Sequence, residues 1–318
     1  MKALVFEHSR VAVMERPLPT LRAGHAIVQV QMAGVCNTDI EIAKGYMGFS
    51  GVLGHELYGV VTACEDASWV GKRVAGEINQ ACGRCDMCLR GLGRHCPTRT
   101  VMGILGADGC FAEYVALQTN NLHPLPNSLS DERACFVEPT AAAFEILEQV
   151  SITPEHNVAV LGDGKLGLLI AQVIATTGCA PTLVGRHPRK LSLARDHGAR
   201  VAELAELPAK SFDVVVEATG SADGMNAALH LTRPRGTLVL KSTYHGSLEL
   251  NAAPIVIDEI TLVGSRCGPF DPAIDALSRG VVDPSAMIDA IYPLGEAAQA
   301  MQRATEPGVL KVLLDMRG

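Results

Sequence analysis

Four cysteines within a short glycine-rich segment constrain this chain more than any other feature. They are Cys82, Cys85, Cys88 and Cys96, in the run A-C-G-R-C-D-M-C-L-R-G-L-G-R-H-C. Two residues separate each of the first three, so four thiolates can converge on one point without an extended backbone. A disulfide-bonded loop is the alternative, but four thiols at this spacing are typical of a metal site. Since all four ligands are cysteine and no position is left for water, we predict a structural zinc site.

The composition limits the class of protein. With 318 residues, the chain is longer than one core usually serves, so we expect two domains. A net charge of −7 and 4% aromatic residues argue against nucleic-acid binding. The longest apolar run, 158–175, is interrupted by Asp163 and Lys165, so we expect no membrane span. Ten cysteines without a signal peptide indicate a reducing compartment, the cytoplasm.

Three residues in separate segments are candidates for a second zinc site. Cys36 lies in G-V-C-N-T-D-I, His55 in G-V-L-G-H-E-L and Glu138 in V-E-P. A lone cysteine is usually a core residue and a lone histidine a satisfied polar group. Together, however, they supply thiolate, imidazole and carboxylate ligands of the kinds that zinc accepts. Three protein ligands leave a fourth position open, which is the arrangement of a catalytic zinc.

The neighbours of these residues are also polar. Thr38 lies two residues after Cys36 and could pass a proton. Asp39 and Glu56 adjoin the candidate ligands, so they could orient them or join them around the metal.

The second half of the chain begins with a nucleotide-binding motif. The run V-A-V-L-G-D-G-K-L-G-L-L-I-A-Q-V-I-A, 158–175, predicts a buried strand, a glycine turn and an apolar helix. This is the context that the pattern G-x-G-x-x-G requires for a dinucleotide pyrophosphate. The free N–H groups of the helix N-terminus can bind phosphate. The predicted cofactor-binding residues here are Gly162, Gly164, Lys165, Leu166 and Gly167.

The residues after the next predicted strand, 181–184, indicate the cofactor. An acid usually stands there to bind the adenosine ribose, but this chain has Gly185 followed by Arg186, with Arg189 and Lys190 close by. A guanidinium can bind a 2′-phosphate through paired hydrogen bonds. We therefore predict NADP, with NAD as the second possibility. The alternative is that these cations are only the solvated start of a helix.

Further strands are expected at 213–220, 236–244 and 259–268, with helical stretches between them. Strands that alternate with helices indicate a parallel sheet covered on both faces. The fold class that we predict for this half is α/β.

Taken together, these motifs resemble the zinc-containing medium-chain dehydrogenase/reductase family of alcohol, sorbitol, threonine and glucose dehydrogenases. The resemblance covers nearly the whole chain: C-N-T-D, G-H-E, the four-cysteine lobe, V-E-P and the glycine motif occur in the family's order. It implies that Cys36 and His55 bind the catalytic zinc and that Glu56 can approach it. Glu138 matches the third ligand of polyol and sugar members, with Cys135 as its rival. Thr38 matches the hydroxyl that takes the substrate's proton.

The resemblance also implies a fold. A GroES-like, partly open β-barrel forms a catalytic domain from residues 1–140 and 281–318, with the structural zinc lobe at 81–97. A Rossmann domain, 141–280, is inserted into it. Thr219, in E-A-T-G, would lie beside the nicotinamide ribose. The strand at 259–268 would pair subunits into a homodimer or homotetramer.

One residue departs from the family pattern. Many alcohol and polyol members have a histidine five residues after the first ligand, which carries the proton to solvent, and this chain has Glu41 there. Glu41 resembles sugar-oxidising members, or it is simply a solvated surface charge.

The function predicted from the sequence is a zinc-dependent oxidoreductase. It would transfer a hydride between NADP(H) and an alcohol, polyol or sugar hydroxyl, or its carbonyl, with zinc as a Lewis acid on the substrate oxygen. Two alternatives stay open: a zinc-independent enone or quinone reductase of the same superfamily, and a non-catalytic nucleotide-binding redox or metal sensor.

Overall fold

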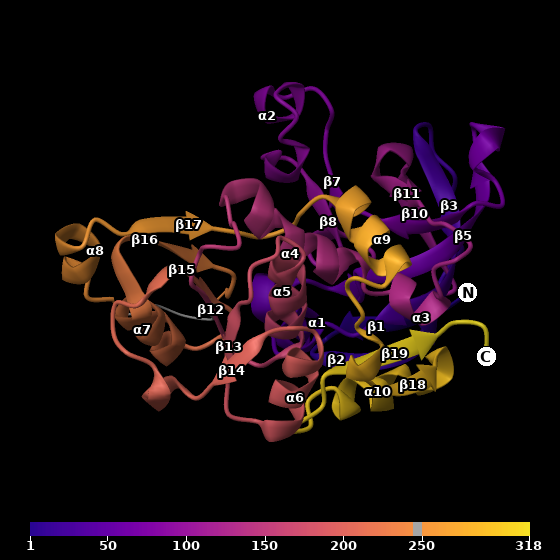
Figure 1. The fold of residues 1–318 in the computed structure, drawn as a ribbon. Coiled ribbons are helices and arrows are strands. Elements are labelled where there is room, and N and C mark those ends of the chain that lie inside the picture. The colour runs from indigo at the N-terminus through magenta and orange to yellow at the C-terminus, as the bar shows by residue number, and fades with distance from the viewer. Residues whose placement is uncertain (244–249) are drawn as a thin grey trace. The chain divides into compact units, whose positions relative to one another are not determined.

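A computed structural model describes residues 1–243 and 250–318 of the chain. They form two compact units (Figure 1). Unit 1 consists of Met1–Glu138 and Pro284–Gly318, and unit 2 of Pro139–Asp283. Unit 1 is therefore discontinuous in sequence, with unit 2 inserted between its two segments.

Unit 1 is built on a seven-stranded sheet. Its central strand β3 (His25–Gly34) pairs antiparallel with β5, β10 and β19. The two terminal strands, β18 and β19, come from the second segment and pair parallel with each other. The strand order is β11 (Leu122–Pro124), β6 (Arg73–Gly76), β5 (Glu56–Cys64), β3, β19 (Lys311–Asp315) and β18 (Ile288–Pro293), with β10 (Tyr114–Gln118) added on β3.

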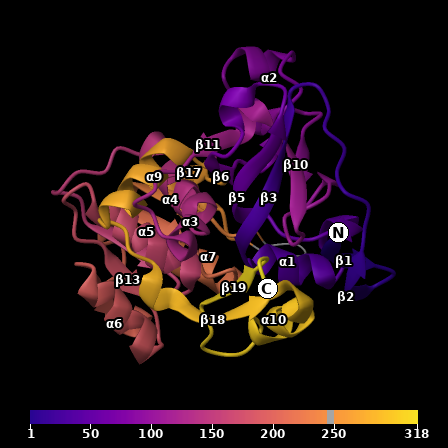
Figure 2. The same ribbon diagram turned by 90° about the vertical axis from the view of Figure 1, so that its right-hand side faces the viewer.

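Two small sheets and several short helices complete unit 1. One sheet has the order β2 (Arg10–Glu15), β1 (Lys2–Glu7), β4 (Gly51–Val52), and the other β7 (Asn79–Gln80), β8 (Thr100–Met102), β9 (Gly106–Ala107). The α-helices are α1 (Asn37–Ala43), α2 (Asp86–Leu89), α3 (Asp131–Ala134) and α10 (Ala297–Arg303). Single 3-10 turns lie at Tyr46–Gly48, Ala67–Trp69, Gly93–His95, Thr119–Asn121, Ser285–Met287 and Leu294–Glu296. The lobe that carries α2 projects from the strands of unit 1 in both views (Figures 1 and 2).

Unit 2 contains a six-stranded sheet in which every pair is parallel. Its order is β14 (Arg200–Ala202), β13 (Thr182–Val184), β12 (Val158–Leu161), β15 (Phe212–Glu217), β16 (Thr232–Leu240) and β17 (Thr261–Gly264). Numbered from β12, this is the 3-2-1-4-5-6 order of the Rossmann fold, whose ligands bind where the order reverses, between β12 and β15.

The helices of unit 2 follow the strands along the chain. They are α4 (Val137–Gln149, which begins in unit 1), α5 (Lys165–Ala175), α6 (Pro188–Asp196), α7 (Ala222–Leu231), α8 (Ala253–Ile257) and α9 (Phe270–Arg279), with a 3-10 turn at Leu204–Glu206. All four residues of β12 and eight residues of α5 are buried. Strands this apolar are typical of a parallel sheet that is covered on both faces.

The strands expected from the sequence are confirmed with shifted ends. The strand predicted at 236–244 is β16, which ends at Leu240, and Tyr244 lies outside the described residues. The strand predicted at 259–268 is shorter, because β17 ends at Gly264. Among the described residues, no helix is long and apolar enough to cross a membrane.

The glycine turn after β12 yields a matched pair of stability predictions. A Cβ added at Gly167 would lie 1.8 Å from the carbonyl oxygen of Gly162, whereas one at Gly164 would meet nothing within 4 Å. Overpacking of this kind typically costs about 1–3 kcal/mol. We expect Gly167→Ala to lower the melting temperature by several degrees, and Gly164→Ala to change it by about one degree or less but to weaken nucleotide binding. Equal melting temperatures of the two variants in differential scanning fluorimetry would contradict this packing.

Candidate active site

The site in unit 1 is organised by the Asp39 carboxylate, which is fully buried at the start of α1. Oδ2 of Asp39 accepts a hydrogen bond of 2.8 Å from the main-chain N–H of Cys36, the residue that caps the helix. Oδ1 accepts from the main-chain N–H of Gly54 at 3.2 Å and lies 3.2 Å from Nδ1 of His55. One carboxylate therefore ties the segment of Cys36 to the segment of His55, which is distant in sequence.

The backbone before His55 has little freedom. Gly54 has φ of +96°, a left-handed conformation that favours glycine. A Cβ at this position would lie 2.3 Å from the ring of Phe111, which is fully buried. His55 is thus fixed at the entry to β5 by close packing as well as by Asp39.

Cys36, His55 and Glu56 come together as potential metal ligands. One donor atom from each lies within 4.8 Å of the others, and His55 and Glu56 are buried. Burial by itself lowers the pKa of His55, but the charges of Asp39 and Cys36 raise it well above its ordinary value. The cluster therefore favours a positive charge at this point, and its thiolate, imidazole and carboxylate donors fit Zn²⁺.

A buried lysine balances part of this negative charge. Lys311, on β19, is fully buried and forms an ion pair with Oε2 of Glu56. Its ammonium also lies 5.3 Å from the centre of the Phe136 ring, in a cation–π contact. Burial lowers the pKa of Lys311, but Glu56 and Cys36 raise it above its ordinary value, so the side chain stays charged. The sequence analysis missed Lys311, although a lysine in the apolar run V-L-K-V-L-L was a visible signal.

Glu138 and Cys135 are the two candidates for the third zinc ligand. The Glu138 carboxylate is not in the group of atoms within 4.8 Å, but it interacts with the charges of His55 and Glu56. Burial raises its pKa to about 7, and His55 opposes this shift. Burial also raises the pKa of the Cys135 thiol well above its ordinary value, and its Sγ donates to the carbonyl of Asp131. Neither side chain belongs to the group of donor atoms that lie within 4.8 Å of one another.

Two further predicted residues lie on α1. The hydroxyl oxygen of Thr38 lies 3.7 Å from Sγ of Cys36. Glu41 faces solvent instead, where its carboxylate forms an ion pair of 2.9 Å with the exposed Lys44. Glu41 is thus placed as a surface charge.

The four cysteines of the lobe also converge. Their sulfurs lie within 4.8 Å of one another, with Cys85 and Cys88 at 3.4 Å and Cys82 and Cys88 at 3.9 Å. These four cysteines are free thiols. A disulfide-bonded loop is therefore not what the structure shows.

The lobe favours thiolates at two of its positions. Main-chain N–H groups of Arg84 and Cys85 lower the pKa of Cys82. The main-chain N–H of Cys82, followed by the Thr98 hydroxyl, lowers that of Cys96 to about 6. Four thiolates this close repel one another unless a cation lies between them, so this donor set fits a structural Zn²⁺.

In unit 2, the glycine motif forms the turn between β12 and α5. Gly162 has φ of +111°, and a Cβ there would lie 2.6 Å from the carbonyl oxygen of Ala218. Gly164 caps α5, and the first residues of that helix are Lys165 and Leu166, both half-buried. Open space beside Gly164 leaves room for a pyrophosphate at the N-terminus of α5.

The other predicted cofactor residues lie at the ends of neighbouring strands. Gly185 follows β13, with Arg186 and Arg189 exposed and Lys190 half-buried. Thr219 follows β15, where its N–H and hydroxyl both donate to Oε1 of Glu217.

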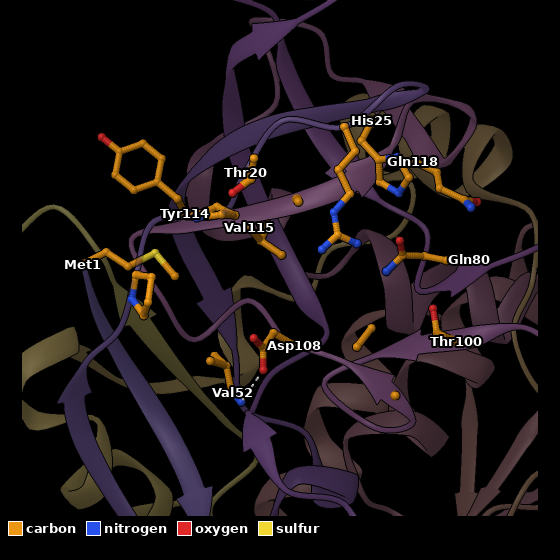
Figure 3. Close-up of a pocket in the computed structure, with 17 residues that line it drawn as sticks. Met1, Thr20, His25, Val52, Gln80, Thr100, Asp108, Tyr114, Val115 and Gln118 are labelled. Carbon is orange, nitrogen blue, oxygen red and sulfur yellow. Dashed lines mark hydrogen bonds between the residues drawn. The ribbon is translucent and has the colours of Figure 1, made fainter.

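Figure 3 shows a cavity of about 440 Å³ in unit 1. Its lining includes Arg22, His25, Tyr114 and Asp108, which accepts a hydrogen bond of 3.0 Å from the main-chain N–H of Val52. Cys36, His55 and Glu138 are not among the residues that line it. We therefore assign it no part in the chemistry.

Removal of the Lys311 charge tests the electrostatic account of the zinc site. Loss of one partner from a buried ion pair typically costs about 3–5 kcal/mol. We expect Lys311→Met to destabilise the protein by about that much, and Lys311→Met with Glu56→Gln to recover part of the loss. Lys44→Met, which breaks the exposed pair with Glu41, should cost about 1 kcal/mol or less. Guanidinium unfolding of the three variants measures these differences, and a Lys311→Met protein as stable as Lys44→Met would contradict the account.

Family models match both units. The alcohol dehydrogenase GroES-like domain matches residues 22–127, and the zinc-binding dehydrogenase model matches residues 166–279. The chain is 28% identical to D-arabinitol dehydrogenase 1 of Uromyces fabae, over 98% of this chain and 96% of that protein.

Solved structures agree with the family models. The alcohol dehydrogenase RspB of Escherichia coli CFT073, in complex with NADH, superimposes with a TM-score of 0.91 at 28% identity and covers 99% of both chains. A zinc-binding dehydrogenase of Sinorhizobium meliloti 1021 bound to NADP superimposes with a TM-score of 0.90 at 27% identity, over 99% of this chain and 98% of that one. With the metal-binding groups of unit 1 and the Rossmann sheet of unit 2, these matches show that the chain belongs to the zinc-containing medium-chain dehydrogenase family and is a zinc-dependent oxidoreductase with a nicotinamide cofactor.

Proposed function

We propose that this protein oxidises a secondary hydroxyl of a polyol, or reduces the corresponding ketose, with a nicotinamide cofactor. The observation that carries the proposal is the convergence of Cys36, His55 and Glu56 around the buried Asp39. A donor set of thiolate, imidazole and carboxylate next to a hydroxyl is suited to alcohol oxidation.

The residues of the chain have distinct roles in this proposal. A zinc ion held by Cys36, His55 and Glu138, with Glu56 beside it, would supply Lewis acidity to the substrate oxygen. Asp39 holds the ligand segments in place through hydrogen bonds to their main-chain N–H groups. Thr38, whose oxygen lies 3.7 Å from Sγ of Cys36, would accept the proton that the substrate hydroxyl loses and pass its own hydroxyl proton on toward solvent.

Two observations support a polyol as the substrate. The relative from Uromyces fabae is named for D-arabinitol, a polyol. In addition, Glu138 is the candidate third ligand, because its carboxylate interacts with the charges of His55 and Glu56, whereas the Cys135 thiol donates to the carbonyl of Asp131. Glu138 in V-E-P is also the feature by which the sequence resembles polyol and sugar members of the family.

The cofactor and the roles of the two units follow the sequence predictions. The preference for NADP rests on Arg186, Arg189 and Lys190 after β13. Unit 2 would be the dinucleotide-binding domain and unit 1 the catalytic domain. The free thiols of the lobe and of Cys36 support a reducing location, the cytoplasm.

The outer edge of the parallel sheet supports a homo-oligomer. Within the described part of the chain, the strand β17 is the last of its sheet, and Leu262 on it is 39% exposed. Val256 and Ile257 of the preceding helix α8 are each 76% exposed. An open strand edge next to apolar side chains is a surface on which a second copy can extend the sheet, which gives a dimer or, through further contacts, a tetramer.

Activity on a polyol panel tests the proposed function. We expect the zinc-loaded protein to reduce NADP or NAD with polyols such as D-arabinitol and sorbitol, at rates well above those with simple primary alcohols. Cys36→Ser should lower kcat/KM by at least about 100-fold, since partners of metal ligands alone are worth 10–100-fold. The control is Cys64→Ser, a half-buried thiol of the same unit that lies outside both ligand groups. Normal turnover by Cys36→Ser would contradict the proposed mechanism.

The oligomeric state has its own test. Leu262→Asp places a charge on the open edge of β17, so we expect light scattering after gel filtration to show a smaller species than the wild type. Leu204→Asp is the matched control, because Leu204 is 45% exposed elsewhere on unit 2. If Leu262→Asp keeps the mass of the wild-type oligomer, the subunits do not pair through β17.

A further inference from the structure

Asp163 lies between the first two glycines of the glycine motif, and its carboxylate reaches the end of the neighbouring strand, β13. Asp163 is only 7% exposed. Its Oδ2 accepts hydrogen bonds of 2.9 Å from the main-chain N–H groups of both Arg186 and His187. The ring Nδ1 of His187 also lies 2.9 Å from Oδ2 and 3.0 Å from Oδ1. The carboxylate is therefore anchored beside the first residues that follow β13.

Gly185 shows that this carboxylate fills the position of a missing side chain. A Cβ built on Gly185 would lie 2.5 Å from Cβ and Oδ2 of Asp163 and 2.7 Å from its Cγ. The three nearest atoms thus all belong to Asp163. In Rossmann domains that bind NAD, the residue after the second strand usually carries the acid that binds the adenosine ribose. Here the second strand ends in glycine, and an acid from the glycine turn occupies the space.

We propose that Asp163 is the carboxylate that accepts the adenosine ribose hydroxyls in this enzyme, and that it lowers the affinity for a 2′-phosphate. The inference rests on the proposed function of unit 2 as the dinucleotide domain and deepens it. Oδ2 takes both main-chain hydrogen bonds, whereas Oδ1 has only the His187 ring among these contacts. Since each carboxylate oxygen can accept two hydrogen bonds, Oδ1 retains the capacity to accept a ribose hydroxyl.

The same geometry acts against NADP. The main-chain N–H groups of Arg186 and His187 would be natural donors to a phosphate, but Asp163 already accepts from both. A phosphate at this place would also face the Asp163 charge, because hydrogen bonds from these N–H groups lower the pKa of Asp163 against the effect of its burial. The exposed guanidinium of Arg186 attracts a 2′-phosphate and Asp163 repels it, so the two residues set the cofactor ratio in opposite directions.

The test is the binding of nucleotides to the zinc-loaded, full-length protein, without any substrate. The dissociation constants of NADH and NADPH are measured by nicotinamide fluorescence, and those of AMP and adenosine 2′,5′-bisphosphate by displacement. We expect Asp163→Asn to weaken the binding of NADH and AMP and to strengthen the binding of NADPH and adenosine 2′,5′-bisphosphate. The ratio of the dissociation constants within each pair should therefore change by at least about tenfold in favour of the 2′-phosphorylated nucleotide. Arg186→Ala should move both ratios the other way. Ratios unchanged by Asp163→Asn, or an equal loss for both nucleotides, would overturn the proposal.

Moving the acid from position 163 to position 185 tests whether Asp163 binds the ribose or only supports the fold. Asp163→Gly removes all three atoms that crowd Gly185, so Gly185→Asp becomes possible in the same protein. We expect Asp163→Gly to shift the ratios toward NADP and the double variant to bring them back toward those of the wild type. A double variant that keeps the ratios of Asp163→Gly would count against the proposal.

Nucleotide binding without polyol turnover would contradict only the proposed function, whereas a wild-type protein that binds neither nucleotide would overturn both.

Discussion

The hydrogen bonds of one buried carboxylate, Asp39, hold together the two segments on which the chemistry depends. Cys36 caps a short helix, and His55 stands at the entry of a strand, with eighteen residues of other structure between them. Asp39 accepts from the main-chain N–H at Cys36 and from that of Gly54, and it lies beside the His55 ring. A carboxylate can be buried this completely only when such donors satisfy it. The two ligand segments are therefore held next to each other by hydrogen bonds from their own main-chain N–H groups.

Charge balance explains why so many ionisable groups can be buried in unit 1. Three acidic residues, Asp39, Glu56 and Glu138, gather in unit 1, and Lys311 supplies a positive charge from a strand near the end of the chain. A zinc ion would supply the rest. The second segment of unit 1 thus contributes to the site as well as to the sheet, since β19 carries Lys311 and pairs with β3. Asp163 repeats the same device in unit 2, where a buried carboxylate accepts main-chain N–H groups and leaves acceptor capacity for a ligand.

Local patterns in the sequence predict much of this architecture. Contacts between residues that are distant in sequence cannot be predicted from such patterns. The glycine motif, the run of buried strands and the spacing of the four cysteines each follow from rules that act over a few residues, and the Rossmann sheet and the clustered thiols confirm them. Lys311 was missed because its partner, Glu56, lies 255 residues away. The role of Asp163 was missed for a related reason: its carboxylate meets Gly185, which in the sequence appeared only as the absence of an acid. Sequence spacing could not decide between Glu138 and Cys135 either, because they lie only three residues apart, Cys135 at the end of α3 and Glu138 at the start of α4.

The central claim is that unit 1 holds a catalytic zinc between Cys36 and His55, separate from the zinc of the four-cysteine lobe. Anomalous X-ray scattering at the zinc absorption edge, from crystals of the zinc-loaded protein, locates each metal directly. The account predicts two peaks per subunit, one among Cys82, Cys85, Cys88 and Cys96 and one bonded to Cys36 and His55, with the Glu138 carboxylate nearer to it than the Cys135 sulfur. A single peak in the lobe, in protein that is active, would contradict the account.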